Sequence, residues 1–326
     1  MVLDSTNVDP LAVVQAEAKI GNGCRVAARA TIGVGAVVSD RASIGESAAI
    51  LAGATIGNDT MVLARATIMS AARLGNEVIV ESGATVMPDA RVEDATRVGV
   101  EATVGARSQI GQGVFLADLS HVGDDCSIGQ GTTIGDSAAI GGAVQIGEGV
   151  TIEAGAIIKD RVKIGDGARI EKGAVVDEDA VIGKGANVGK RAEVGAGSSL
   201  AAGVRVGSAA KLGQKVTLAV GVQVAADAEI GDGSRLYAGV SVGEGATIGQ
   251  GAKLQQHVTV GARARLHECV WAYQRAEVGE GAIVEKEVTL ARECTVGAGA
   301  TVREASDVPE RATIPVCTIF AGQKQS

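Results

Sequence analysis

The sequence predicts an all-β protein built as a single parallel β-helix, and three regularities support this prediction. An aliphatic side chain recurs at every sixth residue from Val14 to Val308, and Ala272 is the single exception. The fifth residue of each six-residue repeat is mostly small, and glycine is frequent at the second and fourth residues. No residue is inserted or deleted between Val14 and Thr313, so we expect no loops to leave the repeat.

Each six-residue repeat predicts one short strand followed by one bend. The fifth, sixth and first positions should point inward, outward and inward, because side chains alternate along a strand. Glycines at the second and fourth positions, as in Ile164–Arg169, are expected to supply the positive φ of a tight corner. A strand with one buried face is unstable alone, so successive turns should stack in parallel. Helical hairpins are excluded, because a period of six does not match 3.6.

The repeat also sets the expected domain organisation. A chain of 326 residues would often form two domains, but a solenoid grows in one dimension without dividing. We therefore expect an N-terminal cap and entry strand over 1–13, an uninterrupted β-helix over 14–313, and a C-terminal cap and tail over 314–326. Aromatic residues make up only 2% of the chain, so its core should consist of aliphatic side chains.

Charge and composition exclude several classes of protein. The net charge is −8 without clustered Lys or Arg, which argues against nucleic acid or an anionic membrane as partner. No apolar stretch is long enough to span a membrane, and residues 1–10 do not resemble an export signal. Five scattered cysteines favour a reducing, cytoplasmic location.

Over roughly residues 8–314 the repeat resembles the hexapeptide-repeat, left-handed parallel β-helix superfamily of acyltransferases. The resemblance implies left-handed, triangular coils of three repeats each, about 16–17 coils in all. Residues 7–14 resemble the opening strand of lipid A-type acyltransferases, and Asp307–Pro309 resembles the exit of many hexapeptide acetyltransferases. The resemblance further implies a homotrimer with its active site between chains.

The segment Leu119–Gly129 resembles the histidine segment of lipid A-type acyltransferases, in which two histidines stand three residues apart. His121 takes the place of the first, while Asp124 stands where that family has its general base. We therefore predict that His121 acts as general base with help from Asp124. The alternative, a histidine that only makes a hydrogen bond at a subunit interface, remains open.

The position of His121 in the repeat places it on an uncharged strip. Every eighteenth residue should share one face of the solenoid. On this face the residues are uncharged: Thr31, Ala49, Thr67, Thr85, Thr103, His121, Ala139, Ile157 and Val175. The other faces carry Lys and Arg. Such a strip favours a contact between subunits.

A second candidate is a binding patch in the segment that holds the only tryptophan and both tyrosines. Its members are Tyr237, His257, His267, Trp271 and Tyr273. They could bind a ligand or a partner with Trp271 as the anchor. The alternative is a locally irregular coil whose aromatic side chains cover a gap left by Ala272.

We expect no metal site. A zinc centre of the γ-carbonic-anhydrase kind needs three histidines at one ion. His121 and His257 should lie seven to eight coils apart, on the order of 36 Å. Cys24, Cys126 and Cys294 occupy the small fifth position and are expected to be core residues.

Two functional hypotheses follow from these features. The first is an acyltransferase that moves an acyl group from a CoA or carrier-protein thioester to a sugar hydroxyl or amine. Acyl-CoA or acyl carrier protein would then be a co-substrate, and no cofactor would stay bound. The second is a non-catalytic β-helical scaffold that binds other proteins. The sequence does not name the acceptor or the acyl length.

Overall fold

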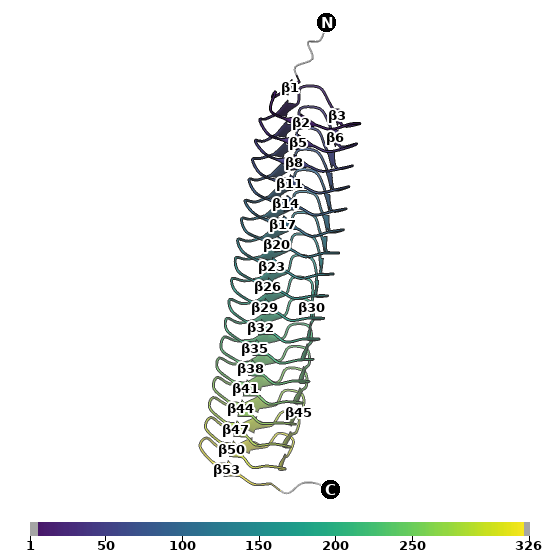
Figure 1. Cartoon of the computed structure of the whole chain (residues 1–326). Coiled ribbons are helices and arrows are strands. Elements are labelled where there is room, and N and C mark those ends of the chain that lie inside the picture. The colour runs from purple at the N-terminus through teal and green to yellow at the C-terminus, as the bar shows by residue number, and fades with distance from the viewer. Residues whose placement is uncertain (1–5, 323–326) are drawn as a thin grey trace. The chain divides into compact units, whose positions relative to one another are not determined.

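Two-residue β-strands form all the regular structure of the chain in a computed structural model that describes residues 6–322. Two compact units divide between Arg161 and Val162. Unit 1 runs from strand β1 (Asn7–Val8) to β26 (Ile157–Ile158), and unit 2 from β27 (Lys163–Ile164) to β53 (Ile319–Phe320) (Figure 1). Each strand begins six residues after the previous one. Within residues 6–322 the structure has no helix that could cross a membrane.

Three parallel sheets arise in each unit, because strands within a unit pair with the strand three places later. In unit 1, sheet A runs from β1 to β25 (Thr151–Ile152), sheet B from β2 (Val13–Val14) to β26, and sheet C from β3 (Lys19–Ile20) to β24 (Gln145–Ile146). The register is eighteen residues, as in Asn7 opposite Arg25 and, in unit 2, Lys163 opposite Val181. The predicted fold class, an all-β solenoid of about 17 turns, is confirmed.

The core of each unit consists of the predicted aliphatic positions. The second residue of each strand from Val26 to Ile314 is buried, and even Ala272 is only 1% exposed. Small residues at the fifth position are buried beside them. Where that residue is polar its hydroxyl is satisfied: Thr60 donates to the carbonyl of Gly75 at 2.8 Å, and Ser108 to that of Gly123 at 2.8 Å. Burial therefore leaves these hydroxyls no unmet hydrogen bond.

The two glycine positions of the repeat have different roles, which corrects the sequence prediction. Only the fourth position has positive φ, and there many other residues adopt it besides glycine, for example Leu119 at 59° and Gly131 at 66°. Where the second position is glycine, the absence of a side chain instead allows close packing of stacked coils. A Cβ added to Gly129 would lie 2.5 Å from the carbonyl carbon of Gly147. Close packing therefore limits substitution at glycines of the second position, and the fourth position forms the bend.

Candidate functional site

His121 is the outward residue of β20 (His121–Val122) in sheet B of unit 1. Its neighbour Val122 is fully buried, so the strand's alternation directs the imidazole away from the core. The residues directly beside it are Thr103 and Ala139. Within the part of the chain that the structure describes, the imidazole has no hydrogen-bond or ion-pair partner. Both ring nitrogens are therefore available to a ligand.

The face around His121 is uncharged along sheet B of unit 1. Its outward residues are Val13, Thr31, Ala49, Thr67, Thr85, Thr103, His121, Ala139 and Ile157. The threonines are half-buried, while Ile157 at one end is 43% exposed. Sheet C of the same unit carries Lys19, Arg73 and Arg91 in the equivalent positions. The predicted uncharged strip thus forms one continuous face in this unit.

Asp124 lies in the turn that follows β20, and its carboxylate is already engaged. Its Oδ1 accepts a hydrogen bond of 2.8 Å from the backbone N–H of Ala106, one coil earlier. The structure has no hydrogen bond between Asp124 and His121 among the described residues. It therefore places the two predicted catalytic residues on the same coil without joining them as a hydrogen-bonded pair.

An ion pair and two exposed apolar side chains near His121 were not predicted from the sequence. Arg107 donates two hydrogen bonds of 2.7 Å to Asp125, and this guanidinium lowers the pKa of that carboxyl. Leu119 is 56% exposed in the turn that leads into β20. Phe115, on the preceding strand β19 (Phe115–Leu116), lies 5.4 Å from the guanidinium carbon of Arg97. An outward phenylalanine in a chain with so few aromatic residues was the available signal.

The second predicted patch lies in unit 2 and is only partly brought together. Tyr237, His257 and Tyr273 lie in successive turns that follow strands β39 (Arg235–Leu236), β42 (Lys253–Leu254) and β45 (Trp271–Ala272). The imidazole of His257 lies close to Gly239 in the turn after β39. A Cβ added to Gly239 would lie only 2.6 Å from the imidazole Nδ1. His267 lies in the turn that precedes β45, at the opposite edge of that strand.

Trp271 is the outward residue of β45 and is 43% exposed. The Nζ of Lys253, on the adjacent strand, lies 4.3 Å from the centre of the indole ring. This cation–π contact was not predicted, although the eighteen-residue spacing of the two side chains could have indicated it. The patch is therefore a lysine–tryptophan pair on a flat strand surface with tyrosines at its edge.

Metal ligands and reactive thiols do not gather at either candidate. No group of three or more His, Cys, Asp or Glu side chains within residues 6–322 could hold a metal ion. Cys24, Cys126 and Cys294 are buried, as predicted, whereas Cys269 and Cys317 are exposed. Burial raises the pKa of the Cys294 thiol to about 11, so this group is protonated at neutral pH.

A family model described as the GMPPB C-terminal domain matches residues 121–220. No curated protein matches the chain. The UDP-N-acetylglucosamine O-acyltransferase of Moraxella catarrhalis is 20% identical over 52% of this chain and 66% of its own, with a TM-score of 0.34. The acyltransferase of Bacteroides fragilis is 21% identical over 57% and 68%, with a TM-score of 0.32.

A further similar structure is the acetyltransferase domain of PglB from Neisseria gonorrhoeae in complex with acetyl coenzyme A. It is 22% identical over 50% of this chain and 55% of its own, with a TM-score of 0.20. The six-residue repeat and the three parallel sheets are themselves features of the hexapeptide-repeat β-helix superfamily, so the resemblance noted in the sequence is confirmed at the level of the fold.

Proposed function

We propose that this protein, whose fold is that of the hexapeptide-repeat β-helix superfamily, is an acyltransferase with His121 as its general base. One observation carries the proposal: an exposed imidazole without partners among the described residues stands on a flat, uncharged face. A general base needs a free nitrogen within reach of the proton that it removes. The imidazole of His121 has free nitrogens among the described residues, and near neutral pH an imidazole is the side chain best suited to accept a proton.

The proposed reaction transfers an acyl group from a CoA or carrier-protein thioester to a sugar hydroxyl or amine. His121 takes the proton from the acceptor as its oxygen or nitrogen attacks the thioester carbonyl carbon. The new C–O or C–N bond forms as the C–S bond breaks, and the departing thiolate receives the proton from His121. Asp124 contributes by fixing the turn after β20 through its bond to Ala106, which is a positioning role.

A homotrimer would complete this site. A flat face offers little enclosure to a substrate, and enzymes bind small molecules in concave sites. A second copy packed against the uncharged face of unit 1 would supply the missing wall next to His121. The half-buried threonines around it carry no charge that such packing would have to desolvate.

The test is an assay of acetyl transfer from acetyl-CoA to glucosamine, in which the released CoA is measured by chromatography. A thiol dye is unsuitable, because Cys269 and Cys317 are exposed and would react. We expect His121→Ala to lower the rate about 100-fold or more, the usual contribution of a general base. His267→Ala, a change at an exposed histidine in unit 2, should keep the wild-type rate. Equal rates for wild type and His121→Ala would overturn the proposed role.

The second candidate is a non-catalytic scaffold, and the engaged carboxylate of Asp124 favours it. A histidine without an oriented carboxylate partner lacks the arrangement that fixes its tautomer in many enzymes. The constant six-residue spacing of the strands also leaves no loop to form a pocket near His121. In this case Trp271 would anchor a protein partner. Release of CoA no faster than without protein, together with unaltered melting on adding acetyl-CoA, would favour the scaffold.

A further inference from the structure

Two arginines face each other on sheet C of unit 1. Arg73, on β12 (Arg73–Leu74), is the direct cross-strand partner of Arg91, on β15 (Arg91–Val92). Both are outward and exposed. Neighbouring strands lie about 4.8 Å apart, and like charges directly opposite each other destabilise a sheet. Neither guanidinium has a carboxylate partner among residues 6–322, so the chain itself leaves this repulsion uncompensated.

The only comparable pair on the described strands of sheet C is relieved by another contact. Arg235 and Lys253 are also direct cross-strand neighbours in unit 2. There the Lys253 ammonium lies against the face of Trp271, which attracts a cation. Arg73 and Arg91 have no aromatic ring on either side, since the outward residues next to them are Thr55 and Gln109. An anion is therefore the chemical group that would stabilise this pair.

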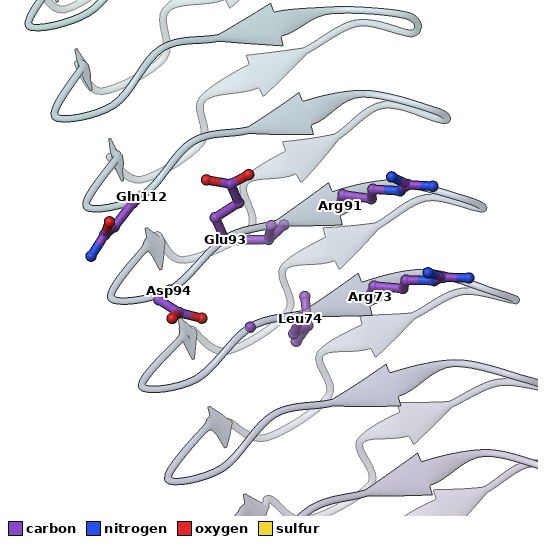
Figure 2. Close-up of a pocket in the computed structure, with 8 residues that line it drawn as sticks. Arg73, Leu74, Arg91, Glu93, Asp94 and Gln112 are labelled. Carbon is purple, nitrogen blue, oxygen red and sulfur yellow. The ribbon is translucent and has the colours of Figure 1, made fainter.

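A hollow of about 320 Å³ opens beside the two arginines. Figure 2 shows Arg73 and Arg91 extending side by side from their strands, while Glu93, Asp94 and Gln112 lie on the corner side. Gly75 and Glu93 occupy the same corner position in successive coils, and both line the hollow. Its volume is that of a small-molecule site.

The two sides of the hollow offer different chemistry. A guanidinium is a planar, permanently charged donor suited to phosphate and carboxylate oxygens. On the other side, Glu93 has no partner among the described residues, whereas Asp94 already accepts from the backbone of Asn76 at 2.7 Å. Glu93 is thus a free acceptor that suits a hydroxyl donor. A ligand that satisfies both sides carries an anion and hydroxyl groups.

We propose that this hollow binds the phosphate monoester of a sugar or another polyol, with Arg73 and Arg91 holding the phosphate and Glu93 accepting from a hydroxyl. Charge decides between a phosphate and a carboxylate. A phosphate monoester carries about −1.5 to −2 at neutral pH and can balance both guanidinium groups, whereas a carboxylate balances one. The site is separate from His121, which lies on sheet B of the same unit.

The experiment is calorimetric titration of the full chain with glucose 6-phosphate in a buffer free of phosphate. We expect Arg73→Gln and Arg91→Gln each to weaken binding about tenfold or more, because each removes a charge-assisted contact. The matched control is Arg265→Gln. Arg265 is also an outward, exposed strand arginine without an ion-pair partner among residues 6–322, and it does not line this hollow. Its loss should leave binding unchanged.

Further probes separate the two halves of the ligand. Glucose should not bind, and inorganic phosphate should bind more weakly than glucose 6-phosphate. The Glu93→Gln change should weaken the binding of glucose 6-phosphate and leave the binding of inorganic phosphate unchanged. Binding should strengthen from about pH 5 to about pH 8, as the phosphate gains its second charge. The proposal is overturned if about 10 mM glucose 6-phosphate produces no binding heat, or if the arginine variants bind as tightly as wild type. Acetate binding as tightly as phosphate would contradict the phosphate assignment.

Discussion

At the scale of single residues, each corner depends on one backbone conformation that glycine adopts most easily. The fourth residue of the repeat has positive φ whether it is Gly131 at 66° or Asp125 at 58°. For a residue with a side chain this conformation costs roughly 1–2 kcal/mol. Stacking offsets the cost, since the same residue donates its N–H to the previous coil, as Asp125 does to Ala106 at 2.9 Å. Corner residues are therefore held in place by their neighbours more than by their own preference.

Two glycines of one corner should respond differently to the same substitution. Gly131→Ala places a Cβ in open space but keeps the positive φ, so we expect a loss of about 1 kcal/mol. Gly129→Ala forces the backbone of the next coil to move, and overpacking of this kind costs about 1–3 kcal/mol. Urea unfolding, monitored by circular dichroism, should give Gly129→Ala a lower free energy of unfolding than Gly131→Ala. Both variants should be less stable than wild type. The reverse order would show that the positive φ of the fourth position costs more than overpacking at the second.

Cysteine reactivity tests the inward register directly. At mildly alkaline pH a maleimide should modify Cys269 and Cys317 and spare the other three thiols, which are buried. Desolvation raises the pKa of Cys294 to about 11 and also raises the pKa of Cys24 and Cys126, so these groups hold little thiolate, the reactive form. Mass spectrometry of the native protein checks this, with protein in urea as the control in which all five cysteines react. Rapid labelling of Cys294 in the native protein would contradict the predicted register.

At the scale of strands and turns, polar ladders join successive coils of unit 1. At one corner, each side chain accepts a hydrogen bond from the backbone of the coil before it. Asp40 accepts from Asn22 at 2.8 Å, Asn58 from Asp40 at 3.1 Å, and Asn76 from Asn58 at 3.0 Å. Asp94 closes the ladder by accepting from Asn76 at 2.7 Å. These bonds satisfy turn N–H groups that the sheets cannot reach.

Removing a side chain from the middle of this ladder should lower the stability of the protein, although the side chain is on the surface. Asn58→Ala removes the acceptor for the N–H of Asp40, and we expect a loss of about 1 kcal/mol. The matched control is Gln112→Ala, a change at the same corner position one coil beyond Asp94, where the side chain has no hydrogen bond among the described residues. Thermal melting of the two variants gives the comparison. Equal melting temperatures would mean that water replaces the lost acceptor.

The elements that could be predicted are those that depend on local spacing. The six-residue period correctly placed Val122 inside and His121 outside, because alternation along a strand is a local property. The eighteen-residue spacing brings Asp124 near Ala106, but it does not give the direction of the carboxylate, so the hydrogen bond from the backbone of Ala106 was not predicted. His267 was predicted in the same patch as Tyr273 because the two are close in sequence, but they lie in different turns. Residues near in sequence lie at opposite edges of β45, while residues eighteen apart are neighbours.

At the scale of the whole molecule, stability within each unit is the sum of many similar contacts. Every strand meets the next strand of its own sheet through the same parallel register, and the core of each unit is aliphatic throughout. Repeat proteins of this kind behave as a row of units coupled to their nearest neighbours. What distinguishes one face from another is therefore its outward residues, and in unit 1 charge distinguishes sheet B from sheets A and C.

The uncharged face predicts where copies of the chain would associate. We expect wild type to have three times the 32.5 kDa mass of one chain in light scattering after size-exclusion chromatography. Thr85→Arg places a charge in the middle of this face, and burying it without a partner would be costly, so the trimer should dissociate.

Thr151→Arg makes the same change on sheet A of unit 1, at a similarly half-buried outward position, and should leave the trimer intact. If Thr151→Arg dissociates the protein and Thr85→Arg does not, the interface excludes His121 and the proposed active site loses its second wall. A wild type that is already monomeric would have the same consequence, because the flat face around His121 would then have nothing to enclose a substrate.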